Sequence, residues 1–444
     1  MINGVNAQPS RRPHVYELDL LRAVTALAVV AVHTLSFTVG LNQTEGGMEV
    51  QNAIVTVLHF TREVFMFVTA FALVYVYYGK PRLADRLSEA RMQFVGGLHN
   101  DTFKLRCFWF KRGIGVLLPY VVWSLIYTWF NAPTQTPLTF ARTSLINILS
   151  GNAAFQLYYI LLTIQLYILL PVFIAFLKRV AHHPWRVLIM SFIVQLVILY
   201  ADYQLFRVGT WGTTPVGKFI VQYQDRFILF YQFFFVLGGL TALYLPQVRA
   251  MMLLYSRWIV GGGVLGLVAL LMNYVIQVRV LQEPAALATV VLQPIVAIYS
   301  LTFIALAFWV AFRWARHTDE AGHPARYRLW QTLSDASFGV YLIHALFLLL
   351  LLKWLVPIMP VAWSVGLRVF ILWFLTAGGS LIASLVLLRI PILSRLIGRS
   401  GPLPQRKAVA PAAERAHGQS ILEEHEAHER MIVYDIEQRI AIKP

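Results

Sequence analysis

The stretch LDLLRAVTALAVVAVHTLSFTVG, residues Leu18–Gly40, decides the fold of this 444-residue chain. After Arg22 the stretch continues to Gly40 with no charged residue except for the titratable His33. A helix of about 20 predominantly apolar residues crosses the hydrocarbon core of a bilayer. The stretch is long for the apolar part of a signal peptide and lacks a clear small-residue cleavage site. We therefore expect it to be a retained first membrane helix.

Composition extends this expectation to the rest of the chain. Hydrophobic residues make up 58% of it and charged residues 13%, whereas soluble domains carry about 25% charged residues. We expect an all-α integral membrane protein of about ten transmembrane helices. The fifth span is short and needs flanking residues. The spans are Leu18–Gly40, Ile54–Tyr78, Gly113–Phe130, Leu157–Leu177, Val187–Tyr200, Phe227–Leu245, Ile259–Val275, Ala286–Phe312, Phe338–Val356 and Trp363–Leu388.

The net charge of +16 lies mostly in alternate connections between these spans. That distribution is typical of the positive-inside bias, so we expect both termini to face the cytoplasm and no nucleic-acid partner. Residues 1–17 form a polar N-terminal segment, residues 18–390 one membrane domain, and residues 391–444 a polar cytoplasmic tail. Within the tail, Met431–Ile442 is either a short amphipathic helix or disordered. Cys107 is the only cysteine, which excludes an intrachain disulfide.

Two titratable residues share one face of the first span. Eleven helical steps of about 100° bring His33 almost to the azimuth of Arg22, about 16 Å farther along the axis. Ionisable residues inside a membrane usually face a protein interior or a wet cavity. Alone, Arg22 could be a snorkelling anchor and His33 a hydrogen-bonded core residue. Together, a cation near one interface suits an anionic donor, and a deep imidazole suits proton transfer from an alcohol.

This helix resembles the opening helix of the membrane acyltransferase-3 family, which is marked by arginine, ten residues and histidine. Further motifs resemble the family in the same order along the chain, from about Tyr16 to Arg389. They are Val64–Phe71, Lys111-Arg112 with Leu118-Pro119-Tyr120, Tyr158-Tyr159 with Gln165-Leu166-Tyr167 and Pro171, Phe234–Gly238 and Ser337–His344. Family members often carry histidine where Gln156 stands and Ser-Gly where Thr69-Ala70 stand. These departures resemble the branch of the intercellular-adhesion polysaccharide proteins.

The resemblance implies a multi-pass enzyme of a bacterial inner membrane that transfers an acyl group from acyl-CoA. Acetyl-CoA is the donor expected before any other, and no metal is expected. The acceptor would be a hydroxyl of a cell-surface polysaccharide or glycolipid. His33 would act as general base or proton relay and Arg22 would contact the donor or organise the site. Lys111, Arg112 and Tyr120 would bind the cofactor. The two basic residues could equally be simple topology charges.

Four further residues complete the expected site. Glu63 reaches about the depth of His33, so it could orient the imidazole. It could instead serve only its neighbours Arg62 and His59. Tyr158 and Gln165, seven residues apart on one helix face, would contact substrate together with His344. Ordinary helix packing explains these three residues as well.

Two other classes of function stay open. One is a glycan exporter or flippase component without acyl chemistry, although the spans hold few of the carboxylates that proton-driven carriers use. The other is a structural membrane subunit, which leaves the shared face of Arg22 and His33 unexplained. The sequence does not give an oligomeric state.

Overall fold

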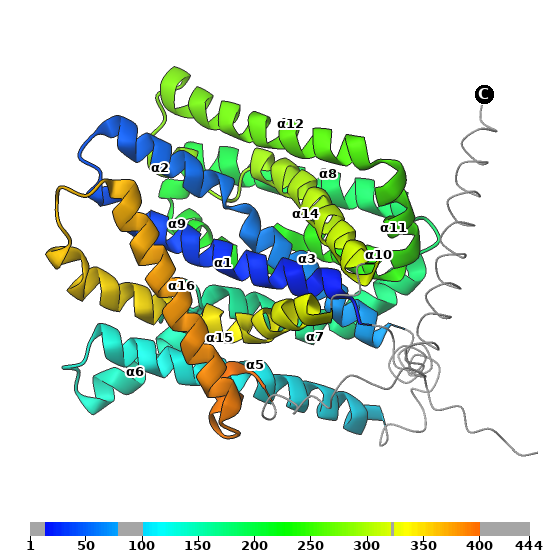
Figure 1. Ribbon diagram of the computed structural model, residues 1–444, viewed down its shortest axis with the longest axis horizontal. Helices are drawn as coiled ribbons and strands as arrows, with labels where there is room; N and C mark the ends of the chain where they lie inside the picture. The colour runs from blue at the N-terminus through cyan, green and yellow to red at the C-terminus, as the bar shows by residue number, and fades with distance from the viewer. Residues whose placement is uncertain (1–13, 79–100, 321–323, 400–444) are drawn as a thin grey trace, which may run out of the picture.

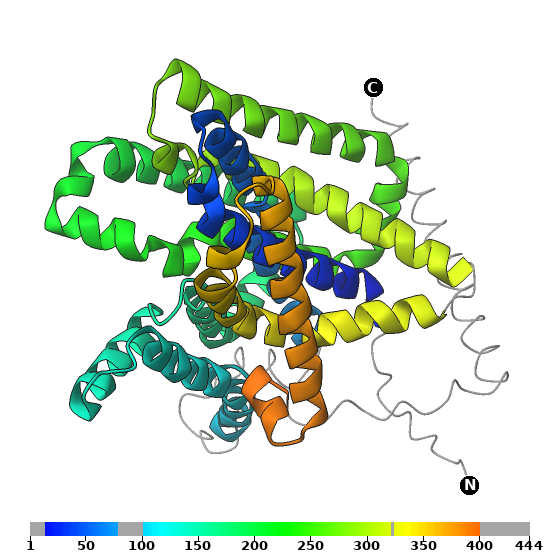
Figure 2. The same ribbon diagram turned by 60° about the vertical axis from the view of Figure 1, so that its left-hand side comes forward.

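Within the part that the structure describes, the chain folds into helices only (Figures 1 and 2). The computed structural model describes residues 14–78, 101–320 and 324–399, apart from the side chains of 101–108, 110–112, 319, 320, 324 and 325. The α-helices are α1 (Tyr16–Thr38), α2 (Glu45–Val57), α3 (Phe60–Tyr77), α5 (Asp101–Asn131), α6 (Pro137–Ser150), α7 (Tyr158–Val180), α8 (Pro184–Asp202), α9 (Pro215–Tyr223), α10 (Gln232–Leu243), α11 (Leu245–Leu254), α12 (Ser256–Val275), α13 (Ala285–Ala288), α14 (Pro294–Glu320), α15 (Pro324–Trp354) and α16 (Val365–Arg389).

Short 3₁₀ and π segments join the α-helices. They are η1 (Val39–Leu41), η2 (Tyr203–Val208), η3 (Thr210–Thr213), η4 (Gln224–Arg226), η5 (Ile228–Tyr231), η6 (Ile276–Val280), η7 (Val356–Ile358) and η8 (Leu393–Ile397). The expected helix around Met431–Ile442 lies outside the described residues.

The number of spans agrees with the prediction. Nine described helical stretches are long and apolar enough to cross a membrane, and the pair Pro215–Arg226 and Ile228–Leu243 adds a tenth that is bent by 53°. The expected span Phe227–Leu245 is the second half of this pair. The short fifth span gains its missing length from flanking residues and runs over Pro184–Val208. The prediction of an all-α membrane protein is confirmed.

Helix α1 lies in the middle of the bundle (Figure 1). It packs against α3, α14, α15 and α16. Glu17 and Asp19 occupy its first turn, where negative charge interacts favourably with the helix dipole. Glu17 also accepts hydrogen bonds from Nη2 and Nε of Arg249 at 2.6 and 2.9 Å. The helix that carries Arg22 and His33 is therefore anchored near its start and enclosed by others.

Three interruptions divide the helices around α1. The first separates α2 from α3 at Leu58 and His59, the second separates α6 from α7 over residues 151–157, and the third bends the chain at Phe227. Non-helical backbone inside a membrane is tolerated where it is buried in protein or lines a cavity. All three interruptions contribute residues to the region described below.

Two hydrophobic clusters form most of the core. One joins α3, α7, α8, α10 and α14, and the other joins α5, the start of α7, α15 and η8. Tyr159 packs against both. Close approach of α3 and α10 requires Gly238, because a Cβ at this position would lie 2.2 Å from the carbonyl oxygen of Phe67. Many large apolar side chains remain exposed, such as Leu265 and Trp258 on α12, as a lipid-facing surface requires.

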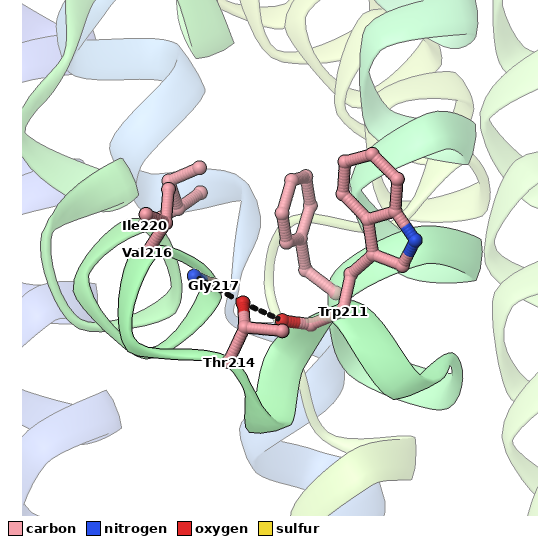
Figure 3. A pocket seen from close by; sticks show the side chains of 6 residues that line it. Trp211, Thr214, Val216, Gly217 and Ile220 are labelled. Atoms are coloured by element: carbon pink, nitrogen blue, oxygen red, sulfur yellow. Dashed lines mark hydrogen bonds between the residues drawn. The ribbon is translucent and has the colours of Figure 1, made fainter.

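An apolar pocket of about 400 Å³ lies between η2, η3 and α9 (Figure 3). It is lined by Phe206, Trp211, Thr214, Val216, Gly217 and Ile220. The hydroxyl of Thr214 donates a hydrogen bond to the carbonyl of Trp211 at 2.6 Å and accepts one from the amide of Gly217 at 3.0 Å. The pocket therefore offers no free acid or base, and the candidate active site lies elsewhere.

Candidate active site

His33 of α1 and His344 of α15 lie beside each other inside the bundle. Their ring centroids are 5.4 Å apart and their planes differ by 23°. His33 is half-buried and makes no hydrogen bond to a described residue. His344 is fully buried. The structure thus brings together two residues that the sequence assigned to different roles, and we call them the histidine pair.

One hydrogen bond orients the His344 ring, and Tyr127 holds the helix turn around it. Its Nδ1 lies 3.1 Å from the carbonyl oxygen of Val340, and its buried Nε2 has no hydrogen-bond partner among the described residues. If Nδ1 donates to that carbonyl, Nε2 carries the lone pair and can accept a proton. Tyr127 of α5 holds the same turn, because its hydroxyl donates to the carbonyl of Leu342 at 2.7 Å and accepts from the amide of Leu346 at 3.1 Å.

Phe155 covers the histidine pair. Its ring centroid lies 4.4 Å from that of His33 and 6.1 Å from that of His344. Phe155 belongs to the interruption between α6 and α7, which starts at Gly151 in the left-handed conformation, φ 75°. The Tyr341 hydroxyl donates to the backbone carbonyl of Gln156 and so ties this segment to α15.

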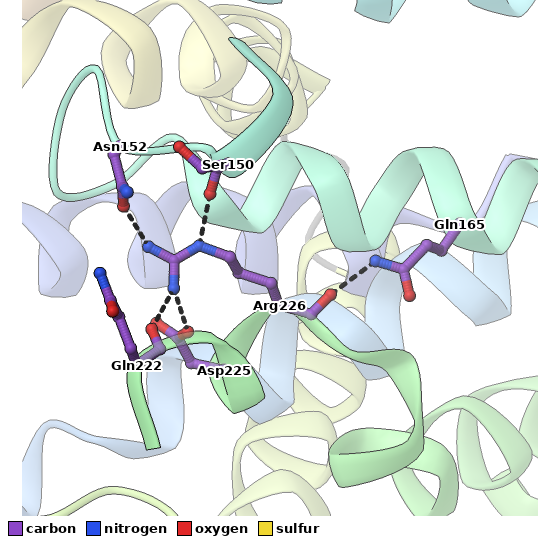
Figure 4. A network of polar contacts seen from close by, with 6 residues as sticks. All are labelled: Ser150, Asn152, Gln165, Gln222, Asp225 and Arg226. Carbon is purple, nitrogen blue, oxygen red and sulfur yellow. Dashed lines mark hydrogen bonds and ion pairs between the residues drawn. The ribbon is translucent and has the colours of Figure 1, made fainter. Parts of the chain in front are cut away.

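Arg226 connects the interruption that holds Phe155 to the bend at Phe227 (Figure 4). Its Nε donates to the Ser150 carbonyl at 2.6 Å, and Nη2 donates to Oδ1 of Asn152 at 2.5 Å. Its Nη1 donates to the Gln222 carbonyl at 2.6 Å and to Asp225 at 2.8 Å. These bonds satisfy polar groups that neither interrupted helix can satisfy alone.

Gln165, expected to bind substrate, supports the same bend. Its Nε2 donates to the Arg226 carbonyl at 2.5 Å, and its Oε1 accepts from the Ile228 amide at 3.2 Å. Both ends of its side-chain amide are therefore occupied by backbone (Figure 4). Tyr158 lies instead under a cation, because its ring centroid is 5.1 Å from Cζ of Arg62. The two residues share a helix but have different neighbours.

The first turn of α3 brings charge to the histidine pair. Arg62 and His59 both lie within electrostatic range of the His33 ring. Glu63 is buried beside Arg62 and Ser300, and its Oε2 has no hydrogen-bond partner among the described residues. Glu63 and Arg62 are neighbours in the first turn of α3. Both expected roles of Glu63, an action on His33 and a local interaction with Arg62 and His59, stay predictions.

Arg22 lies at the other end of the same interior region. It is half-buried in α1 and within electrostatic range of Tyr159, whose hydroxyl lies 3.0 Å from Oγ1 of Thr69. It also lies in range of His14, which precedes the helix. A hydrogen bond to Asp19, 2.5 Å long, raises the pKa of His14. Arg22 and His33 therefore lie at two different depths along the continuous helix α1.

The expected cofactor residues fall on α5. The side chains of Lys111 and Arg112 lie outside the described residues. Tyr120 is buried, and its hydroxyl donates to the carbonyl of Ile148 in α6 at 2.6 Å. In this structure that hydroxyl supports the contact between α5 and α6, and its role in binding a cofactor stays a prediction.

The sequence did not predict site roles for Arg62 or Phe155. The sequence could have indicated a role for Arg62, because placing an arginine inside a membrane span costs free energy and such residues usually serve a function. We assigned it only to a local interaction with Glu63. Phe155 had no such signal. It follows a helix-ending glycine, and nothing in its local pattern shows that the segment turns inward.

Comparisons with known proteins show which family the chain belongs to. Residues 15–389 match the family model of the acyltransferase domain Acyl_transf_3. The chain is also 23% identical over 347 residues, 76% of its own length and 82% of the relative, to the protein named "Putative membrane-bound acyltransferase YfiQ" from Bacillus subtilis (strain 168). No solved structure matches it significantly. The chain belongs to the acyltransferase-3 family and is a multi-pass membrane O-acyltransferase.

Proposed function

We propose that the protein transfers an acetyl or other short acyl group from cytoplasmic acyl-CoA to a hydroxyl of a cell-surface polysaccharide or glycolipid. The observation that carries the proposal is the histidine pair, with ring centroids 5.4 Å apart. Its half-buried member, His33, makes no hydrogen bond to a described residue, which leaves a ring nitrogen available to accept a proton. Positioned general bases accelerate such reactions by about 10²–10⁴-fold.

The proposed reaction assigns the proton to His33. The imidazole accepts the proton of the acceptor hydroxyl while the hydroxyl oxygen attacks the thioester carbonyl carbon. The carbon–sulfur bond then breaks, and the leaving sulfur of coenzyme A takes the proton back from the imidazolium. His344 stacks beside the His33 ring and so limits the orientations that the proposed base can adopt.

We place Arg22 on the donor side. In the proposed topology both termini face the cytoplasm of a bacterial inner membrane, so Arg22, six residues into α1, lies near the cytoplasmic interface. Its guanidinium would contact a phosphate of the donor. Lys111 and Arg112 are proposed to add charge at the same entrance, with the acyl end of acyl-CoA reaching inward toward His33.

The resemblance to the branch of the intercellular-adhesion polysaccharide proteins motivates the choice of acceptor. The competing proposal is export of a glycan without acyl transfer. The deciding experiment compares His33→Ala with the wild-type protein in cells that make the surface glycan. Base-labile ester per sugar and exported glycan are measured separately. His182→Ala, at an exposed histidine in the loop after α7, is the matched control.

Acyl transfer predicts that His33→Ala loses ester while export and membrane protein level stay unchanged. The control variant should behave as the wild type does. Loss of export with unchanged ester per sugar would overturn the proposal in favour of the exporter.

A further inference from the structure

The guanidinium of Arg62 lies inside the bundle and has no hydrogen-bond partner among the described residues. It lies in the first turn of α3, directly after the interruption at Leu58 and His59. Its side chain is half-buried, and its described direct contact is the Tyr158 ring, 5.1 Å from Cζ. A guanidinium has five N–H donors, and here none of them is bonded to a described residue.

Two other half-buried arginines show what a structural role looks like in this protein. Arg226 donates four hydrogen bonds across two interrupted helices. Arg249 donates two to Glu17. Such bonds compensate the large cost of removing a charge from water. Arg62 lacks them, so its position is not explained by a structural role of this kind.

The charges around Arg62 do not neutralise it by direct contact. Glu63 and Asp225 lie within electrostatic range, but Asp225 is bonded to Arg226 at 2.8 Å. Oε2 of Glu63 is buried without a partner. The hydroxyl of Tyr231, fully buried and in range of Arg62, also has no hydrogen-bond partner among the described residues. The cluster therefore keeps several polar groups available, and Arg62 is the permanently charged donor among them.

The position of Arg62 relative to His33 indicates which anion it would bind. Cζ of Arg62 lies 5.1 Å from the centroid of the Tyr158 ring, and Tyr158 begins α7 directly after the interruption whose Phe155 lies 4.4 Å from His33, the proposed base that takes a proton from the acceptor. The negative charge that develops next is on the carbonyl oxygen of the acyl group, at the atom bonded to the attacked carbon. Preorganised donors aimed at such an oxygen are usually the largest single contribution to catalysis.

We propose that Arg62 is a further catalytic residue, whose guanidinium stabilises the oxyanion formed during acyl transfer; this inference rests on the proposed function. As the acceptor oxygen bonds to the carbonyl carbon and gives its proton to His33, the carbonyl π pair moves onto the oxygen beside Arg62. When the C=O bond forms again, the C–S bond breaks and the coenzyme A sulfur leaves with the proton from His33.

The test uses inverted membrane vesicles from cells that make the surface glycan, which supply the natural acceptor. Radiolabelled acetyl-CoA is added, and the label that mild base releases from the glycan is counted. The variants are Arg62→Gln, Arg62→Lys and, as a control, Arg279→Gln. Arg279 is 63% exposed and pairs with Glu49 away from the histidine pair. Binding of coenzyme A to each purified full-length protein is measured separately.

We expect Arg62→Gln to lower kcat by about 10²–10³-fold while its affinity for coenzyme A and its thermal midpoint stay close to wild type. Arg62→Lys, which keeps the charge, should recover part of the rate, and Arg279→Gln should match wild type. An unchanged rate in Arg62→Gln overturns the inference. So does a loss of rate matched by an equal loss of coenzyme A affinity, which would make Arg62 a donor-binding residue. If the wild-type protein transfers no label, it is the proposed function itself that fails.

Discussion

His33 and His344 lie with their ring centroids 5.4 Å apart, although they belong to the first and the penultimate of the long helices. The two ring nitrogens of His344 differ in their surroundings. Nδ1 lies at the Val340 carbonyl, whereas Nε2 has no partner among the described residues. The pair is therefore asymmetric. His344 is fully buried and hydrogen-bonded, whereas His33 is half-buried and is the proposed base.

This asymmetry predicts the effect of changing His344. We expect His344→Gln to lower transfer about 10²-fold or more, because the imidazole that supports His33 is lost while a polar side chain of similar length remains. Transfer of labelled acetyl groups into the glycan measures the effect. The rate of His344→Gln should then depend on pH differently from that of the wild type. A parallel profile at a wild-type rate would leave His344 with a packing role only.

Glu63 provides a second prediction. We expect Glu63→Gln to lower acyl transfer without loss of protein from the membrane, because the amide has nearly the same shape but removes a negative charge beside Arg62. Ester content and the amount of membrane protein are measured on the same cells. Wild-type ester content in this variant would show that the carboxylate has no part in the reaction.

A third prediction concerns stability. Arg226→Gln removes bonds to the Ser150 carbonyl and to Asn152, and hydrogen bonds to charged groups contribute about 1.5–3 kcal/mol each. We expect the thermal midpoint of the purified protein to fall by several degrees. The exposed pair of Arg279 with Glu49 is the matched control, and its loss should change stability by less than about 1 kcal/mol. Equal midpoints for the two variants would contradict the role given to Arg226.

The ion pair of His14 with Asp19 predicts a dependence on pH. The hydrogen bond to Asp19 raises the pKa of His14. The stabilisation is therefore fully present below the ordinary histidine pKa of about 6.5 and is lost as the pH rises through the raised value. The side chain of His14 is 53% exposed, so the effect is small. Thermal midpoints of wild type and His14→Gln should differ more at acidic than at alkaline pH, and a difference that grows with pH would contradict this assignment.

Much of the fold could be predicted from apolar run lengths alone. The runs around Leu18–Gly40 and Trp363–Leu388 correspond to α1 and α16 within a few residues. The reason is physical, because bilayer thickness sets helix length and few other structures satisfy backbone groups in lipid. The interruption at Phe227 could not be predicted in this way. Apolar run length marks Phe227 only as the start of a span, whereas the bend there depends on hydrogen bonds that Gln165 supplies from another helix.

The site was predictable to a similar extent. Helical periodicity places Arg22 and His33 on one face of one helix, and the structure has them on α1. The contact of His33 with His344 depends on how α1 and α15 pack, which no local pattern encodes. The same is true of Phe155, which reaches the pair only because Gly151 ends α6 in a left-handed conformation.

The bonds of Arg226 also limit how this protein can move. Because one guanidinium serves both interrupted helices, separating them would leave the Ser150 carbonyl and the Asn152 side chain without their described partner. A movement that separates the two interruptions would therefore have to break charged hydrogen bonds, whereas a movement of both together would keep them.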